Sequence, residues 1–329
     1  MRVNLSVNIG RLRLKNPVMV SSGTFGYGEE FKDFIELKEL GAIVTKTITL
    51  NPRSGNPAPR TCETPAGMLN SIGLENPGLA AFIEEKLPIL KKIGVPIIVS
   101  ITSEDSLEEF VTIARRLDKL KEVQAIELNI SCPNIKSKVK SHPPSPRLRG
   151  IVRRSFSEGG QKSKLISQDP KATYNLVSRV RKVTRKTLIT KLSPNVTDIT
   201  QIAQVAQKAG SDAVSLINTL TGMSIDTNKR EPKIACITGG LSGPAIRPVA
   251  VRMVWEVYQK IKIPIIGMGG IMDTQSALEF FIAGATAISV GTANFINPKV
   301  TLEIIEGIKK YLIRNKIKNI ASLVGSLKL

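Results

Sequence analysis

The sequence predicts an α/β fold, a single (β/α)8 TIM barrel with an N-terminal hairpin and a loop insertion after strand four. Three observations predict it: eight short apolar runs, helical stretches between them, and a length of 329 residues that suits one domain over 1–329. The runs lie at 17–20, 42–47, 96–101, 125–130, 187–192, 213–218, 264–268 and 287–291. Eight strands alternating with helices predict a closed barrel rather than an open sheet.

Each element can be justified in order along the chain. Residues 3–14 form the expected hairpin, which precedes the first strand and plugs the bottom of the barrel. The strand runs are almost continuously apolar, as parallel strands covered by helices on both faces require. Helices are expected at 107–120, 171–183, 199–209, 250–261 and 274–283. Asp273 is suited to cap a helix start, and Gly210 and Gly284 are suited to end helices.

The segment 137–166 fits neither a strand nor a helix of the barrel. It contains His142-Pro143-Pro144-Ser145-Pro146-Arg147, and its eight Lys or Arg and one Glu contribute +7 to the formal net charge of +20. We therefore expect a disordered basic insertion within the barrel domain. The remaining positive charge is spread along the chain, so a dedicated nucleic-acid surface is not favoured.

Composition argues against several kinds of protein and site. No apolar run approaches the roughly 18 residues of a membrane span, and the first residues lack a signal-peptide pattern, so a cytoplasmic protein is expected. The three cysteines, Cys62, Cys132 and Cys236, show no CxxC or CxxH spacing, which predicts neither a disulfide framework nor a metal site. The only histidine, His142, lies in the loop-like segment, so acid–base chemistry must come from other side chains.

Polar residues follow several predicted strands, where barrel enzymes place their sites. Lys46 and Lys191 each end an apolar strand, and an inward-facing ammonium there needs an anion or an electron-rich ring, both of which a flavin supplies. The pairs 269–270 and 291–292 follow strands seven and eight, where barrels commonly bind phosphate on backbone N–H groups. Taken singly, such lysines are also found solvated, and such glycines also make tight turns.

Cys132 lies between Asn129 and Asn134, on the loop after strand four. A lone cysteine is commonly a buried structural thiol. At a barrel mouth it is instead placed to act as a base or nucleophile, and a free thiol with a pKa of about 8.5 is weakly ionised at neutral pH. Asparagines, which both donate and accept, suit a planar substrate rich in amide groups.

Five motifs in this order resemble class 1 dihydroorotate dehydrogenases, and their wording is closest to the class 1B catalytic subunit. They are ETPAGMLNSIGLENPG at 63–78, NISCPN at 129–134, KLSPNV at 191–196, GGLSGPAIRP at 239–248 and GMGGI at 267–271. The resemblance spans nearly the whole chain except 137–166. It implies flavin-dependent oxidation of dihydroorotate to orotate in pyrimidine (UMP) biosynthesis.

The resemblance also implies site residues. Cys132 would remove the C5 proton of dihydroorotate while a hydride passes from C6 to flavin N5, and one lysine, Lys191, would stabilise the reduced flavin. The implied FMN-binding residues are Ser21, Lys46, Thr47, Ser100, Asn129, Lys191, Ile217, Gly243, Gly269, Gly270, Gly291 and Thr292. The implied substrate-binding residues are Lys46, Asn70, Ser71, Ile72, Gly73, Leu74, Asn129, Asn134, Asn218 and Thr219.

The partner implied by class 1B is a second subunit that carries FAD and a two-iron two-sulfur cluster and passes electrons to NAD. This sequence has no four-cysteine cluster pattern and no dinucleotide fingerprint, so those cofactors are expected only in the partner. A homodimer of this chain within a heterotetramer is implied.

The sequence departs from the family at Ser100, where an Asn is usual, and at the insertion 137–166. Three alternatives remain open. One is the fumarate-dependent class 1A enzyme. Another is a tRNA dihydrouridine synthase, for which the 37 residues after Thr292 leave little room for an RNA-binding domain. The third is a non-catalytic nucleic-acid-binding barrel.

Overall fold

Eight parallel strands form a closed barrel at the centre of the computed structural model, which describes residues 1–103, 106–131 and 165–328. Each predicted run contains one barrel strand, and every residue of these strands is buried, as strands covered on both faces require. The predicted fold class is confirmed. In spatial order the strands are β3 (Val18–Val20), β4 (Ala42–Val44), β7 (Ile97–Ile101), β8 (Ala125–Asn129), β9 (Thr187–Lys191), β10 (Ala213–Leu216), β15 (Ile265–Gly267) and β16 (Ala287–Val290).

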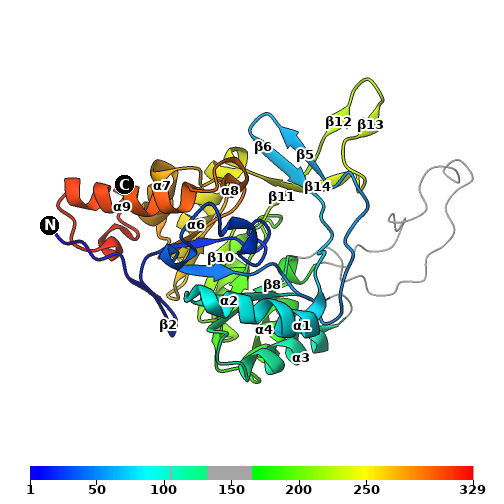
Figure 1. Ribbon diagram of the computed structural model, residues 1–329, viewed down its shortest axis with the longest axis horizontal. Coiled ribbons are helices and arrows are strands. Elements are labelled where there is room, and N and C mark those ends of the chain that lie inside the picture. The colour runs from blue at the N-terminus through cyan, green and yellow to red at the C-terminus, as the bar shows by residue number, and fades with distance from the viewer. Residues whose placement is uncertain (104–105, 132–164, 329) are drawn as a thin grey trace, which may run out of the picture.

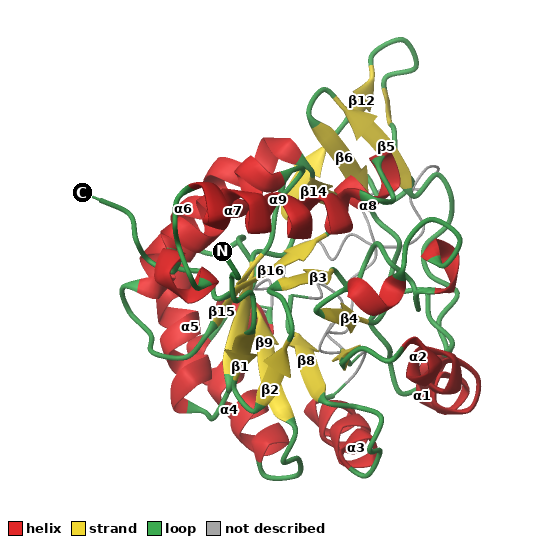
Figure 2. Cartoon of the chain, turned by 60° about the vertical axis from the view of Figure 1, so that its left-hand side comes forward, coloured by secondary structure: helices red, strands yellow, loops and turns green. Residues whose placement is uncertain are grey.

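Helices lie around the outside of the barrel (Figure 2). The five expected helices are present, although α6 begins three residues earlier than predicted because Pro248 fits its first turn. Asp273 accepts a hydrogen bond from Ser276 N at the start of α7, and Gly284 ends that helix. The α-helices are α1 (Gly78–Ala81), α2 (Leu87–Ile93), α3 (Leu107–Asp118), α4 (Pro170–Arg181), α5 (Ile199–Lys208), α6 (Arg247–Tyr258), α7 (Thr274–Ala283), α8 (Ala293–Ile296) and α9 (Val300–Arg314). A π-helical segment, η3 (Phe82–Lys86), joins α1 to α2, and 3-10 turns are η1 (Glu29–Phe31), η2 (Leu37–Glu39), η5 (Ile166–Gln168), η6 (Pro244–Ile246) and η7 (Ile320–Leu323).

The expected N-terminal hairpin is formed by β1 (Val7–Ile9) and β2 (Leu12–Leu14). Its turn lies against the amino ends of β9 and β10. A Cβ atom at Gly10 would lie 2.7 Å from Asp212 Cβ and 3.3 Å from Thr187 Cγ2. The hairpin therefore covers the bottom of the barrel and leaves the carboxyl ends of the strands for the site.

A four-stranded antiparallel sheet stands beside the barrel, at the end of the molecule away from both termini (Figure 1). The sequence patterns did not predict it, because its strands are half-buried and rich in glycine rather than apolar. Its strands belong to the segments that follow β4 and β10, so the sheet lies on the carboxyl side of the barrel. Its order is β11 (Leu220–Met223), β14 (Thr238–Ser242), β6 (Gly67–Asn70) and β5 (Thr61–Thr64), with a small hairpin of β12 (Ile225–Asp226) and β13 (Glu231–Pro232) beyond it.

Most of the expected insertion, residues 137–164, lies outside the described residues. Its last two residues, 165 and 166, are described: Ile166 begins η5, the 3-10 turn that precedes α4. Ile166 is buried, and its carbonyl accepts a hydrogen bond from Thr173 Oγ1 at 2.7 Å. Among the described helices, none is long and apolar enough to cross a membrane.

Candidate functional site

Lys191, the last residue of β9, is a buried cation without an anionic partner among the described residues. Its side chain is 6% exposed, and its Nζ donates to Ser22 Oγ at 3.3 Å, just beyond β3. Burying an ammonium without a counter-charge is unfavourable. The site therefore favours a bound group that carries negative charge or an electron-rich face.

Lys46 is a second cation at this end of the barrel. It is half-buried two residues after β4, where its backbone N donates to Gly26 O at 3.0 Å. Its ammonium has no hydrogen bond or ion pair within the described part of the chain. Two lysines thus reach the same barrel mouth, and the described residues supply no counter-charge for either.

Amide and hydroxyl side chains from three strand ends join into one cluster. Asn129 Nδ2 lies 3.4 Å from Thr47 Oγ1, and its Oδ1 accepts from Asn218 Nδ2 at 3.3 Å. Asn218 Oδ1 in turn accepts from the backbone N of Thr219 at 2.8 Å. Strand register brings these residues beside the lysine, because Asn129 is the direct neighbour of Lys191 on β8 and β9.

Glycines from three loops converge next to this cluster. Gly269 and Gly270 have φ values of +125° and +75°, which side chains rarely adopt. A Cβ at Gly270 would lie 2.8 Å from Gly243 O, and one at Gly291 would lie 3.6 Å from Ser21 Cβ. The backbone N–H groups of 269, 270, 291 and 292 have no acceptor among the described residues. The result is an N–H-lined cradle of the kind that binds phosphate.

The segment 70–74 forms a second set of free donors. Gly73 and Leu74 have positive φ values of +75° and +60°, so consecutive N–H groups turn to one side. The carbonyls of 71–73 accept hydrogen bonds from Arg53 and Asn56 in the neighbouring loop, and Leu74 O accepts from Asn76, two residues further along. The N–H groups of 72–74, by contrast, have no described acceptor, and Ser71 Oγ is buried without a partner.

This segment is joined to the amide cluster through β14. Asn70 Nδ2 donates to Gly240 O at 3.2 Å, and a Cβ at Gly240 would collide with the side chain of Thr219. The donor-rich turn, the amide cluster and the two lysines are therefore parts of one site. These residues lie at the carboxyl ends of the barrel strands.

Comparison with known proteins agrees with this arrangement. A family profile described as "Dihydroorotate dehydrogenase" matches residues 4–312. The chain belongs to the dihydroorotate dehydrogenase family.

Curated relatives cover almost the whole chain. A protein of Geotalea uraniireducens is 51% identical over 324 residues, 98% of each chain, and one of Thermoanaerobacter pseudethanolicus is 49% identical over 326 residues, 99% of each. A protein of Geobacter sulfurreducens is 49% identical over 324 residues, 98% of each. All three are named "Dihydroorotate dehydrogenase B (NAD(+)), catalytic subunit". Dihydroorotate dehydrogenases are flavin-dependent, which agrees with a phosphate cradle beside two unmatched lysines.

Two of the expected site residues of this dehydrogenase, Cys132 and Asn134, lie outside the described residues. Ser131, the residue before the cysteine, is described, and its Oγ lies 3.5 Å from Lys191 O. The other two cysteines, Cys62 and Cys236, are half-buried thiols in the region of the antiparallel sheet.

Three residues that hold the site together escaped the sequence analysis. Asn195 ties its loop to β11, because Nδ2 donates to Thr219 O at 3.0 Å and Oδ1 accepts from Thr221 N at 2.9 Å. Asn76 fixes the donor-rich turn through Leu74 O at 2.7 Å. The third is Glu127, a buried carboxylate inside the barrel. Its signal in the sequence is a charged residue in the middle of an apolar run.

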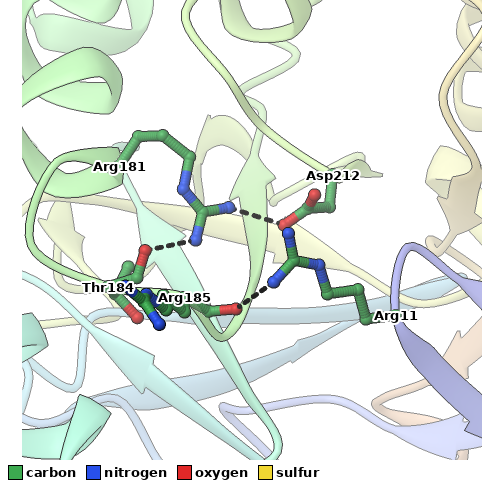
Figure 3. A pocket seen from close by; sticks show the side chains of 5 residues that line it. All are labelled: Arg11, Arg181, Thr184, Arg185 and Asp212. Atoms are coloured by element: carbon green, nitrogen blue, oxygen red, sulfur yellow. Dashed lines mark hydrogen bonds and ion pairs between the residues drawn. The ribbon is translucent and has the colours of Figure 1, made fainter.

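A hollow of about 450 Å³ lies at the opposite end of the barrel, between Arg11, Arg181, Thr184, Arg185 and Asp212 (Figure 3). Arg181 is held there by Asp212 Oδ2 at 2.7 Å and Lys186 O at 2.9 Å. Asp212 also accepts from Leu188 N at 2.8 Å. These bonds lock the strand beginnings together, so this hollow is structural and is separate from the dehydrogenase site.

Proposed function

We propose that this chain is the catalytic subunit of an NAD-linked, B-type dihydroorotate dehydrogenase, which oxidises dihydroorotate to orotate in pyrimidine biosynthesis. One observation carries the proposal: two lysines that have no anionic partner among the described residues lie with an amide cluster and an N–H-lined cradle at one barrel mouth. The relatives' names favour this function over a fumarate-dependent class 1A enzyme, a tRNA dihydrouridine synthase and a non-catalytic nucleic-acid-binding barrel.

FMN fits the donor set at the cradle. The free N–H groups of 269, 270, 291 and 292 suit its phosphate, and Lys191 suits the electron-rich ring. When bound, FMN supplies the acceptor for the hydride that leaves C6 of dihydroorotate. The residues that would hold it are Ser21, Lys46, Thr47, Ser100, Asn129, Lys191, Ile217, Gly243, Gly269, Gly270, Gly291 and Thr292.

Dihydroorotate presents a carboxylate and a ring of amide groups. The N–H groups of 72–74 and the ammonium of Lys46 suit the carboxylate. The asparagines suit the ring, because each amide donates and accepts together. The substrate residues are therefore Lys46, Asn70, Ser71, Ile72, Gly73, Leu74, Asn129, Asn134, Asn218 and Thr219. The segment 70–74 is held by the neighbouring loop, and β14 joins it to the asparagine cluster. Together they would hold the substrate in one orientation.

The proposed base is Cys132, whose Sγ would take the proton from C5 of the substrate. The sequence supports this assignment, because its only histidine, His142, lies ten residues further along in the 137–166 insertion. A thiolate is a competent proton acceptor near neutral pH.

The electrons are proposed to leave through a partner subunit that carries FAD and a two-iron two-sulfur cluster and reduces NAD. The words "catalytic subunit" in the relatives' names support the existence of a partner. We propose a heterotetramer built on a homodimer of this chain, located in the cytoplasm; gel filtration of the co-expressed subunits and cell fractionation would test both.

Anaerobic flavin reduction tests the function directly. The purified chain should carry FMN, and dihydroorotate should bleach its visible absorbance in a single turnover without NAD. Steady reduction of NAD should require the partner subunit. A chain that binds no flavin, or whose flavin dihydroorotate leaves oxidised, would contradict the proposal.

A further inference from the structure

Beneath the substrate site, the barrel interior contains a single buried carboxylate among the described residues, Glu127 in β8. It is 2% exposed. Its Oε1 accepts from Ser100 Oγ and its Oε2 from Ser215 Oγ, both at 3.0 Å. A buried carboxylate needs such donors, because desolvation of an unpartnered charge is strongly unfavourable. The proposed chemistry of the site does not use this group.

One of the two serines connects the carboxylate to the substrate site. Ser100 Oγ lies 2.9 Å from Thr47 Oγ1, which lies 3.4 Å from Asn129 Nδ2. The Asn129 amide then meets Asn218. A continuous chain of hydrogen bonds therefore runs from Glu127 through Ser100 and Thr47 to the asparagines.

The carboxylate fixes the direction of every bond in this chain. Ser100 Oγ donates to Glu127 Oε1, so its single hydroxyl proton is used on the carboxylate. Ser100 Oγ then accepts from Thr47, and Thr47 Oγ1 in turn accepts from the amide nitrogen of Asn129. The amide oxygen of Asn129 is left on the other side, where Asn218 Nδ2 donates to it at 3.3 Å.

We propose that Glu127 is a positioning residue, which sets the orientation of the Asn129 amide through Ser100 and Thr47. It touches neither substrate nor flavin. Its effect is to present the donor and acceptor edges of Asn129 in one fixed arrangement to a substrate whose ring amides need both. This inference rests on the proposed function, because orotate is the ligand that reports it.

Ser215 provides a matched control. It donates to the same carboxylate at the same 3.0 Å, and both serines are fully buried. Unlike Ser100, it has no bond to Thr47 or Asn129. Ser100→Ala and Ser215→Ala therefore remove equivalent hydroxyls from Glu127, and only the first interrupts the chain to the asparagine. Because Ser100 is also a proposed FMN-binding residue, FMN affinity is measured for both variants, and orotate binding is compared only at full FMN occupancy.

The experiment measures orotate binding to the flavin-loaded chain by calorimetry, together with thermal unfolding. Ser100→Ala should weaken orotate binding about tenfold, the effect of losing roughly one hydrogen bond, whereas Ser215→Ala should change it less than about twofold. The two variants should lose similar thermal stability. The KM for dihydroorotate should rise in Ser100→Ala with a smaller change in kcat, since binding is affected before and during reaction alike.

A double-mutant cycle separates positioning from general damage. Where Asn129 is already replaced by Ala, adding Ser100→Ala should have little further effect on orotate binding, because the orientation it controls is gone. If Ser100→Ala instead damaged the fold in general, its loss of orotate affinity would add in full to that of Asn129→Ala. If Ser100→Ala does not give folded protein, Thr47→Val, which keeps the volume and removes the hydroxyl, takes its place in the cycle with the same expected result.

The outcomes are distinguishable. Wild-type protein that fails to bind orotate overturns the proposed function and this inference with it. Wild-type protein that binds orotate, with equal losses in both serine variants or additive losses in the cycle, overturns the positioning role alone.

Discussion

Cationic side chains gather at both ends of the barrel, and the two ends treat them differently. At the amino end, Arg181 bonds to Asp212 and to the carbonyl of Lys186, at 2.7 and 2.9 Å. At the carboxyl end, Lys191 is more deeply buried, yet within the described residues it meets only the hydroxyl of Ser22. The first end has its charge satisfied by the chain, whereas at the second end the described residues supply no counter-charge for Lys191.

The comparison indicates how a structural cluster of cations differs from a functional one. In a structural cluster the fold itself supplies partners for the charges, and in a functional cluster it does not. The arginine hollow is lined by polar side chains, but its hydrogen bonds are already made within the fold (Figure 3). Among the described residues, the carboxyl end carries N–H donors without acceptors and lysines without anionic partners, which lower stability unless something binds. Mutations at the amino end should therefore lower stability without changing ligand binding. Mutations of functional residues at the carboxyl end should impair the reaction or the flavin without lowering stability.

The largest effect is expected at the carboxyl end, from Cys132→Ala. Removing a positioned base slows the reaction by about 10²- to 10⁴-fold, so flavin reduction by dihydroorotate should nearly stop while FMN stays bound. Anaerobic stopped-flow absorbance measures the single turnover, and the wild-type rate should rise with pH as the thiol ionises. Cys62→Ala, at a half-buried thiol in β5, is the control and should react normally. A near-normal rate in Cys132→Ala would reject its role as base.

At the amino end, Arg181→Met should lower stability without affecting ligand binding. It leaves Asp212 and two carbonyls short of a donor, at a cost of about 1–3 kcal/mol in the free energy of unfolding. Urea denaturation gives the loss, and orotate calorimetry should give an unchanged affinity. Weaker orotate binding would show that the two ends are coupled, and would contradict the separation of a structural amino end from a functional carboxyl end.

The sequence predicted the barrel well because burial on both faces demands apolar strands, and such runs are visible without any tertiary information. It failed on the antiparallel sheet, whose strands, such as Thr238–Ser242, are half-buried and glycine-rich. It also missed Glu127, because its partners Ser100 and Ser215 lie 27 and 88 residues away and only barrel closure brings them together. The sequence shows that lysines end two strands. It does not show that the described residues around them include no anionic partner.

A smaller effect is expected from Lys191→Ala, which removes the unmatched charge. An ammonium beside a flavin favours the reduced, negatively charged ring, so the midpoint potential should fall by about 30 mV, equivalent to about 1.4 kcal/mol for two electrons. Spectroelectrochemical titration measures it. The flavin-free chain should be no less stable than wild type, because a buried unpaired charge is lost. An unchanged potential, or a clear loss of stability, would place Lys191 with the satisfied cations of the amino end.

The smallest effect concerns a charge at the carboxyl end whose partners all lie within the chain. Asp273 caps α7, and the hydrogen bond from the backbone N of Ser276 lowers the pKa of its carboxyl below the usual 3.8. Asp273→Ala should cost about 1 kcal/mol at pH 7, as typical caps do. Because the folded pKa is lowered, this contribution is present above the unfolded pKa and is lost as the pH falls through the folded value.

The deficit of Asp273→Ala should therefore stay constant down to about pH 4, near the carboxyl's unperturbed pKa, and shrink below it. Denaturation series at several pH values measure this, with Asp273→Asn as the control, since asparagine keeps the capping acceptor without a titrating charge. Asp273 is exposed, so solvent screens its charge and the local hydrogen bond dominates. Neither variant should alter orotate binding, because this carboxylate, unlike the ammonium of Lys191, is already satisfied by the fold. A change in orotate affinity in either variant would mean that satisfaction within the chain does not separate structural from functional charges at this end.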